Sequence, residues 1–312
     1  CPSDTDFEPA IARENVPMNA RLLDGKALAA ELRAEIAGAV SALQAERGWT
    51  PGLGVVLVGD DPASRSYVTA KEKACAAAGI RSREVALPAA AGRGEILAAV
   101  RDLNDDPETD GILVQLPLPD SSIEREIIEA IDPAKDVDGF HPVNVGRMVL
   151  GLPAFVPCTP AGVLEILRRA DILLSGASVA VIGRSQIVGR PLSILLSQKG
   201  VDATVTLCHT RTKDVARFTR EADVVVVAAG RPGTLTADMV RPGAVVIDVG
   251  VNRVPDSSRA SGCRLVGDAD FDAVAEKASA ITPVPGGVGP MTIAMLLKNT
   301  VEASRRRRIP PA

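Results

Sequence analysis

Aromatic side chains are scarce in this chain of 312 residues: they make up 2% of it, with one Trp and one Tyr. Few groups are therefore available to stack on bases, and a formal net charge of −4 supplies no general attraction for a polyanion. Long apolar runs are missing as well. Runs such as Val224 to Ala229 fall far short of the roughly 18 residues that a membrane helix needs. We expect neither a nucleic acid partner nor a membrane span.

Metal-binding and disulfide-forming patterns are also missing. The chain has only two histidines, and its five cysteines include no CxxC pair and are odd in number. This pattern predicts no metal site and no disulfide framework, and it favours a reducing cytoplasm. The first 17 residues are acidic and lack the apolar segment of a secretory signal, so we interpret residues 1–20 as a leader or disordered extension, with Met18 as a candidate natural start. The cysteines are Cys1, Cys75, Cys158, Cys208 and Cys263.

Strand-length apolar runs alternate with helical patterns from residue 21 onward, which is typical of an α/β protein with a mainly parallel sheet. The length corresponds to about two domains. Strands are expected over residues 53–58, 85–87, 112–116, 179–182, 204–207, 224–227 and 245–249, and helices over 28–43, 64–78, 96–103, 159–169, 189–199 and 290–303. Thr159 is expected to cap the fourth of these helices, and the run Arg305 to Arg308 to be a solvated end of the last one.

A candidate phosphate site follows the strand at 179–182, where the chain passes through Gly183 and enters a helix at Gly189. Such a turn directs backbone N–H groups and a helix dipole at a phosphate. The spacing departs from GxGxxG, so a tight strand-to-helix turn without a ligand remains an alternative. Two further strands end in turns containing Gly230 and Gly250, at the edge where open α/β sheets bind ligands.

The next strand indicates which dinucleotide would bind. NAD enzymes place an acid at its end to accept from the ribose hydroxyl, but this chain has His209, Thr210 and Arg211 there. Together with Arg184 in the preceding turn, these donors favour the 2′-phosphate of NADP. The alternative is that His209 and Arg211 are solvated loop residues.

Tyr67 precedes Lys71 by four residues on an expected helix, so the two share a face. A lysine on a half-buried face can lose its charge through desolvation and exchange protons with a substrate. The same spacing is common on solvated helix faces, which is the alternative. The Tyr-xxx-Lys pair of short-chain dehydrogenases is a poor match, because here the pair comes more than 100 residues before the nucleotide turn, in the other domain.

Three polar residues could complete a chemical site. Gln115 ends a strand ahead of a Pro-Leu-Pro turn, where a neutral amide could orient a lysine without fixing its charge. Asp136 and Asp138 lie in a glycine-containing loop, and could either bind a polar heterocycle or form Asx turns.

With these residues assembled, the chain closely resembles the bifunctional methylenetetrahydrofolate dehydrogenase and methenyltetrahydrofolate cyclohydrolase family from about Leu23 to Thr300. The motifs that carry the resemblance are LLDGK, PASRSYVTAKEKAC, GILVQLPLP, DPAKDVDGFHPVNVGR, PCTPAG, VIGRSQIVGRP, AAGRPG, VIDVGVN and TPVPGGVGPMT. Together they are very specific, although each alone would be weak.

The resemblance implies two α/β domains around a cleft: a folate-binding catalytic domain over residues 21–158 and 290–312, and a Rossmann-like NADP-binding domain over 159–289. It implies a cytoplasmic homodimer that acts on tetrahydrofolate derivatives, with a place in one-carbon metabolism and purine biosynthesis. Lys71 would be the key catalytic residue, aided by Gln115 and Tyr67. Tyr67 would also pack against the folate ring, and Asp138 would bind the pterin.

The remaining implied site residues lie in the second domain. Pro285, Gly286 and Gly287, within the loop Pro283 to Pro290, would line the folate site near the nicotinamide. The residues expected to face NADP are Gly183, Arg184, Ser185, Gly189, His209, Thr210, Gly230 and Val251. Thr210 stands where many relatives have Ser, and Gln186 where some have Lys, which leaves the cofactor preference open.

The implied reaction is oxidation of 5,10-methylenetetrahydrofolate by NADP to the methenyl cation, followed by hydrolysis to 10-formyltetrahydrofolate. Two alternatives are a cyclohydrolase without useful dehydrogenase activity and a folate- or nucleotide-binding protein without turnover. A formate-activating synthetase is not expected, because no GxxxxGK[ST] motif occurs.

Overall fold

A computed structural model describes residues 20–258 and 262–308, and these residues form two compact units. Of the described residues, unit 1 comprises 20–26 together with those of Val163–Gly289, and unit 2 comprises Ala27–Gly162 together with 290–308. The expected leader at residues 1–20, with its candidate start at Met18, lies almost wholly outside the described residues. No helix within the described ranges is long and apolar enough to cross a membrane.

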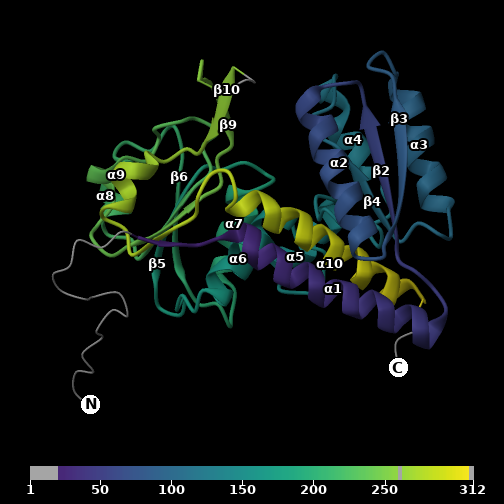
Figure 1. Cartoon of the computed structure of the whole chain (residues 1–312), viewed down its shortest axis with the longest axis horizontal. Coiled ribbons are helices and arrows are strands. Elements are labelled where there is room, and N and C mark those ends of the chain that lie inside the picture. The colour runs from purple at the N-terminus through teal and green to yellow at the C-terminus, as the bar shows by residue number, and fades with distance from the viewer. Residues whose placement is uncertain (1–19, 259–261, 309–312) are drawn as a thin grey trace. The chain divides into compact units, whose positions relative to one another are not determined.

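Unit 2 is built on a three-stranded parallel sheet of order β3-β2-β4. Its strands are β2 (Gly52–Val58), β3 (Arg81–Leu87) and β4 (Gly111–Val114). Every residue of β2 is buried, as expected for the central strand of a parallel sheet covered on both faces. The helical elements assigned wholly or mostly to this unit, seen in Figure 1, are α1 (Gly25–Arg47), α2 (Pro62–Ala77), α3 (Arg93–Asp105), η1 (Ser121–Ile123), α4 (Glu124–Glu129), α5 (Pro142–Val149) and α10 (Val288–Arg308).

Helix α2, which carries Tyr67 and Lys71, has clear start and stop signals. Asp61 caps it by accepting from the backbone N–H of Ser64 at 2.8 Å, and Pro62 occupies the first turn, where no donor is needed. Gly79, with a φ of +72°, reverses the chain directly after the C-cap residue. The expected start at Ser64 was therefore two residues late, and the expected stop at Gly79 is confirmed.

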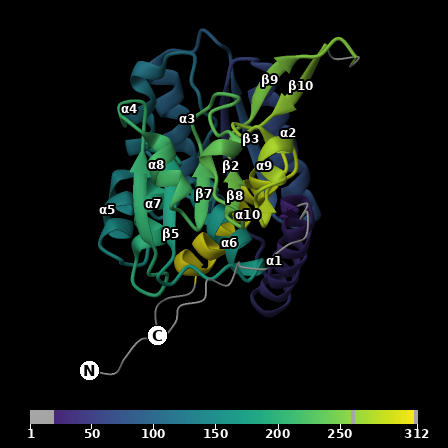
Figure 2. The same cartoon turned by 90° about the vertical axis from the view of Figure 1, so that its left-hand side faces the viewer.

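Unit 1 contains a six-stranded sheet of order β1-β11-β8-β7-β5-β6, in which every neighbouring pair is parallel. Figure 2 shows β5, β7 and β8 running side by side. The chain goes from β5 to β6 on one side and then returns to β7 on the other side of β5, so the strand order reverses between β5 and β7. The strands are β1 (Arg21–Leu22), β5 (Ser178–Ile182), β6 (Thr204–Cys208), β7 (Val224–Val227), β8 (Val245–Asp248) and β11 (Ala280–Ile281).

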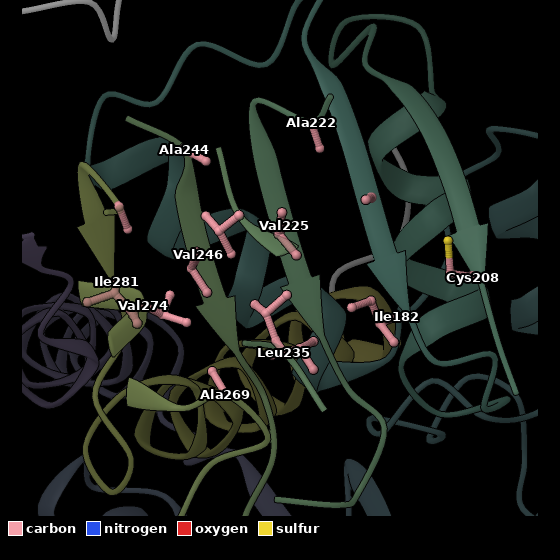
Figure 3. Close-up of a cluster of buried hydrophobic side chains, with 14 residues drawn as sticks. Ile182, Cys208, Ala222, Val225, Leu235, Ala244, Val246, Ala269, Val274 and Ile281 are labelled. Carbon is pink, nitrogen blue, oxygen red and sulfur yellow. The ribbon is translucent and has the colours of Figure 1, made fainter. Parts of the chain in front are cut away.

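The core of unit 1 consists of small and β-branched side chains on this sheet. Figure 3 shows Ile182, Val225 and Val246 on β5, β7 and β8 in one layer. Because the layer contains few large side chains, the helices can approach the sheet closely. The helices of this unit are α6 (Cys158–Arg169, shared with unit 2), α7 (Gly189–Ser197), α8 (Val215–Arg220), η2 (Ala237–Met239) and α9 (Phe271–Ala275).

Two expectations about local structure were wrong. Helix α6 begins at Cys158, one residue before Thr159, so Thr159 lies in the first turn and its hydroxyl contacts that of Thr292 at 3.0 Å. The arginine run is not simply solvated. Arg307 and Arg308 both bind the carboxylate of fully buried Asp110, at 2.8 and 3.0 Å, and so tie the end of α10 to the start of β4.

The sequence pattern did not reveal three short pairings in unit 1. Strands β1 and β11 extend the sheet by two residues each. Strands β9 (Asn252–Pro255) and β10 (Cys263–Val266) form an antiparallel hairpin that projects from the unit in both overall views (Figures 1 and 2). Strands β1 and β11 are too short, and β9 and β10 too short and too polar, to produce a recognisable alternation.

Candidate active site

Lys71 is the centre of the candidate chemical site in unit 2. It is 8% exposed, and its Nζ donates to Oε1 of Gln115 at 2.8 Å. Gln115 follows β4 and its Nε2 donates to the Leu116 carbonyl at 2.7 Å. Because that bond fixes which end of the amide is the donor, the amide oxygen must face the lysine. The structure thus brings together the two residues that the sequence placed 44 positions apart.

Burial of the Lys71 ammonium favours loss of its proton. Burial lowers the pKa of Lys71 below its ordinary value, and the negative charge of Asp138 opposes that shift. Burial also raises the pKa of Asp138, while the Lys71 charge lowers it. The two groups therefore interact, and each is shifted toward its neutral form. A lysine in this setting can exchange protons nearer to neutral pH than a solvated one.

The loop that carries Asp138 is organised around the neighbouring acid, Asp136. Its buried carboxylate accepts from the backbone N–H of Gly139 and Phe140 at 3.2 Å each, from His141 at 2.8 Å, and from the Asn144 amide at 2.9 Å. These backbone bonds go to residues three, four and five positions on rather than two, so Asp136 organises the loop without the expected Asx turn. Because the Asp136 oxygens are used within the protein, Asp138 is the better placed of the two carboxylates for a ligand.

Further contacts hold this loop from distant parts of the chain. The Lys135 ammonium is buried and donates to three carbonyls at the end of α3: Leu103 at 3.0 Å, Asn104 at 2.6 Å and Asp106 at 2.9 Å. It therefore caps that helix as a cation at a C-terminus should. The Asn299 amide of α10 donates to the Val137 carbonyl at 2.8 Å.

Cys158 was counted among the cysteines but was not expected in the site. Its thiol is buried, donates to the Val137 carbonyl at 3.3 Å and interacts with both Asp138 and Lys71. Burial holds its pKa well above the ordinary value, so it is a neutral thiol rather than a nucleophile. Nothing in the spacing of Lys71, Asp138 and Cys158 along the chain could have revealed that they gather.

Tyr67 lies one helical turn before Lys71 on α2 and is 43% exposed. An exposed ring on the same face as a buried lysine offers a flat apolar surface next to the proton-exchanging group. This geometry permits the stacking role expected from the sequence and does not by itself establish it.

In unit 1, the turn between β5 and α7 is closed by two glycines. Gly183 has a φ of +123°, and a Cβ there would lie 2.1 Å from the Ala228 carbonyl oxygen of the neighbouring strand end. A Cβ on Gly189 would lie 1.9 Å from the Gly183 carbonyl oxygen. Only glycine allows the turn and the helix to approach the sheet this closely.

The same turn has donors available for an anion. The Ser185 hydroxyl accepts from the backbone N–H of Val188 at 3.1 Å and of Gly189 at 3.4 Å, which shapes the helix start. Within the described ranges, the backbone N–H groups of residues 184–187 have no hydrogen-bond acceptor, and these four residues are exposed. Exposed N–H groups beside the N-terminus of α7, with Arg184 among them, fit a phosphate-bearing dinucleotide.

The other expected cofactor residues lie at the carboxyl ends of neighbouring strands of this sheet. His209 follows β6, and its backbone N–H donates to the Thr212 hydroxyl at 3.0 Å while its Nδ1 accepts from Arg211 N–H at 3.1 Å. Thr210 is exposed beside it. Gly230 follows β7 and Val251 follows β8, both exposed. Since the strand order reverses between β5 and β7, these ends form the standard ligand position of an open α/β sheet.

The loop with Pro285, Gly286 and Gly287 also belongs to unit 1, between β11 and α10. The Val284–Pro285 bond is cis, Gly286 has a φ of +111°, and the Gly286 carbonyl accepts from Lys26 N–H at 2.8 Å. These residues therefore lie in a different unit from Lys71, Gln115 and Asp138, and their role in substrate binding stays a prediction.

The family model described as the catalytic domain of tetrahydrofolate dehydrogenase/cyclohydrolase matches residues 23–138, and the model of its NAD(P)-binding domain matches residues 157–308. The chain is 56% identical over 288 residues to bifunctional protein FolD 1 of Myxococcus xanthus, a match that covers 92% of this chain and 98% of that protein.

Two solved structures are similar over nearly their whole length. The bifunctional enzyme FolD-methylenetetrahydrofolate dehydrogenase/cyclohydrolase of Campylobacter jejuni has a TM-score of 0.87 and 49% identity, covering 92% of this chain and 99% of that one. The Trypanosoma brucei methylenetetrahydrofolate dehydrogenase-cyclohydrolase, complexed with NADP cofactor and inhibitor, has a TM-score of 0.88 and 41% identity, covering 93% and 99%.

Proposed function

The chain belongs to the tetrahydrofolate dehydrogenase/cyclohydrolase family, and we propose that its Lys71 performs the proton transfers of the reaction. The protein is a bifunctional enzyme of one-carbon metabolism. It oxidises 5,10-methylenetetrahydrofolate to the 5,10-methenyl form with NADP, and it hydrolyses that product to 10-formyltetrahydrofolate.

The observation that carries the proposal for Lys71 is its buried hydrogen bond to Gln115 at 2.8 Å. In the hydrolysis, a water oxygen bonds to the cationic methenyl carbon, and the neutral Lys71 amine takes one proton from that water. Lys71 then returns the proton to N5 as the bond from that nitrogen to the carbon breaks. The second water proton is released when the formyl carbonyl forms. Gln115 keeps the amine aimed at the substrate without adding a charge that would hold the proton on it.

Asp138 and Tyr67 serve substrate binding in this proposal. The Asp138 carboxylate, which also interacts with Lys71 and with the Cys158 thiol, accepts from the donor groups of the pterin. The Tyr67 ring stacks on the folate ring system. Support for both comes from their position beside Lys71 and from the exposure of the tyrosine ring. Pro285, Gly286 and Gly287, in the loop between β11 and α10 of unit 1, are further proposed folate-binding residues.

NADP, when bound, supplies the hydride acceptor of the dehydrogenase step. We assign its phosphates to the free N–H groups of the β5–α7 turn, between Gly183 and Gly189. Arg184, Ser185, His209 and Thr210 supply donors, and the ends of β7 and β8 contribute Gly230 and Val251. On this basis unit 1 is the cofactor domain, and unit 2 is the folate-binding catalytic domain. The substitution of Thr210 for the more usual Ser conserves the hydroxyl that this role needs.

We further propose that the protein works as a homodimer in the cytoplasm and supplies formyl groups for purine biosynthesis. Among the described residues, the buried cysteines Cys75, Cys158 and Cys208 are thiols outside any disulfide, which suits a reducing compartment. Sedimentation velocity on the purified protein measures the oligomeric state directly, and a single species of monomer mass would contradict the dimer.

A spectrophotometric assay tests the function as a whole. The purified protein is mixed with 5,10-methylenetetrahydrofolate and either NADP or NAD, while NADPH or NADH and the methenyl intermediate are followed together. Reduction of NADP with little accumulation of the methenyl form is the expected result. Hydrolysis of added methenyl substrate without any cofactor reduction would instead favour an enzyme restricted to the cyclohydrolase step. Binding without either reaction would favour a folate-binding protein.

A further inference from the structure

The loop after β7, residues 229–233, is held at both ends by one residue that lies much later in the chain. The carboxylate of Asp268 accepts from the backbone N–H of Ala229 at 2.6 Å and of Gly230 at 2.8 Å. At the other end of the loop, the Asp268 carbonyl accepts from Thr234 N–H at 2.7 Å and from Leu235 N–H at 3.2 Å. The side chain and the main chain of Asp268 therefore close the loop from both sides.

The position of Asp268 is itself fixed by burial and by hydrogen bonds at its side chain and its backbone. It is fully buried, and its second carboxylate oxygen accepts from the Asn252 amide at 2.8 Å. Its backbone N–H donates to Asp248 at 3.0 Å. A Cβ on Gly250 would lie 2.2 Å from the Asp268 carboxylate, so the backbone presses against it from that side as well. Figure 3 shows the next residue, Ala269, and Leu235 near the arrowheads of β8 and β7, at the same edge of the sheet.

These bonds decide what the loop can offer to a ligand. Ala229 and Gly230 are exposed, yet their N–H groups point inward and are used by a buried negative charge. The N–H groups of Ala229 and Gly230 are therefore not available to a phosphate, because the Asp268 carboxylate already accepts from both. In the β5–α7 turn, by contrast, the N–H groups of residues 184–187 have no partner within the described ranges. The two glycine-containing turns at this edge therefore have different roles.

We propose that Asp268 is a positioning residue for the dinucleotide: it fixes the start of the loop after β7, at Ala229 and Gly230, as a rigid wall against an uncharged part of the cofactor. This inference rests on the proposed function, because it takes the edge between β5 and β7 to be the NADP site. Asp268 acts through Ala229 and Gly230 and touches no reacting atom. Its effect is on the affinity for the cofactor rather than on the chemical step.

The test compares Asp268→Asn with a matched control, Asp270→Asn. Both remove one negative charge, but Asp270 is exposed and its side chain makes no cap hydrogen bond. In the Asn variant, either the amide NH₂ faces the two N–H donors, which then both lose their acceptor, or the uncharged amide oxygen faces them and the NH₂ opposes the donor amide of Asn252. We expect KM for NADP to rise by about tenfold or more in Asp268→Asn, with kcat of the dehydrogenase changed by less than about threefold. Asp270→Asn should match the wild type.

Two further measurements separate positioning from general damage. Hydrolysis of methenyltetrahydrofolate without NADP reports on the other unit and should stay within about twofold of the wild type. Amide hydrogen exchange should show slow exchange at Ala229 and Gly230 in the wild type and fast exchange in Asp268→Asn, although both residues are exposed. If Asp268→Asn does not fold, Asn252→Ala provides a milder change, because it keeps the Asp268 carboxylate and removes the amide that donates to its second oxygen and to the Gly267 carbonyl.

The outcomes are distinct. Fast exchange at the two amides with an unchanged KM for NADP would overturn the proposal, as would a loss in kcat with unchanged KM. If the wild type fails to reduce NADP, the proposed function fails. In that case NADP binding measured by calorimetry on the same variants still decides whether Asp268 positions a dinucleotide site, and equal affinities in Asp268→Asn and the wild type would refute it.

Discussion

Replacing Gln115 by glutamate would test how the charge of Lys71 is controlled. The amide oxygen of Gln115 accepts a hydrogen bond from Nζ of Lys71 at 2.8 Å, and the amide nitrogen donates to the Leu116 carbonyl at 2.7 Å. Gln115→Glu keeps the shape of the side chain but sets a negative charge beside the amine. A proton-accepting Lys71 would then be held in its charged form at neutral pH.

The size of the effect follows from the geometry. Two unit charges about 4 Å apart interact by about 4 kcal/mol at an effective dielectric constant of about 20, which corresponds to a rise of about 3 units in the pKa of Lys71. The second oxygen of the new carboxylate would face the Leu116 carbonyl in place of an N–H donor. That contact destabilises the charged glutamate, so a rise of about 2 units is a more realistic expectation.

The assay is the pH–rate profile of methenyl hydrolysis. If the neutral amine is the active form, the rising limb of the profile should move to higher pH by about 2 units, with a loss of about a hundredfold near pH 7 that is recovered on raising the pH. Gln115→Leu serves as the control, because it removes the hydrogen bond without adding charge and should lower the rate without an alkaline shift. Coincident profiles for the Glu and Leu variants would refute this account of Lys71.

Three other predictions concern single residues. Lys71→Met should lower cyclohydrolase activity by about 10²–10⁴-fold while thermal unfolding stays close to that of the wild type, and a near-normal rate would contradict the assignment. Asp110→Asn should lower the free energy of unfolding by about 3 kcal/mol in urea titrations, because a buried carboxylate bound by two arginines is lost, whereas exposed Asp105→Asn should have little effect. Burial raises the pKa of Asp248 to about 6, so the folded state binds this proton more tightly than the unfolded state. The wild type should therefore lose about 3 kcal/mol of stability relative to Asp248→Asn as the pH rises from about 4 to 7, and a constant difference across that range would rule out this titration.

The fold was predictable from the sequence where apolar periodicity is strong and turn signals are clear. The β7 strand at 224–227 has the expected bounds, and β2 and β5 extend the expected strands by one residue. The two-residue strands and the β9–β10 hairpin were missed, because their stability comes from pairing partners rather than from their own residues. The N-cap assigned to Thr159 failed for a related reason: its hydroxyl contacts a residue of α10 instead of its own helix.

The candidate site was predictable residue by residue but not as an assembly. A motif can identify Lys71, Gln115 and Asp138, yet only the structure shows the lysine bonded to the amide and Cys158 beside the carboxylate. Asp268 was absent from the sequence interpretation altogether. It supports Gly230 from 38 positions away, and long-range support of this kind leaves no periodic or local signal.

The return of α10 to unit 2 has a consequence for the order in which the protein can be made. The ribosome synthesises residues 27–162 early, but the helix that completes this unit comes after all of unit 1. Until then Asp110 lacks the arginines that neutralise it, and the Val137 carbonyl lacks the Asn299 amide. Residues 163–289, in contrast, emerge as one continuous stretch. The cofactor unit can therefore close during translation before α10 is made, whereas the loop that carries Asp138 becomes fully fixed only once α10 has been synthesised.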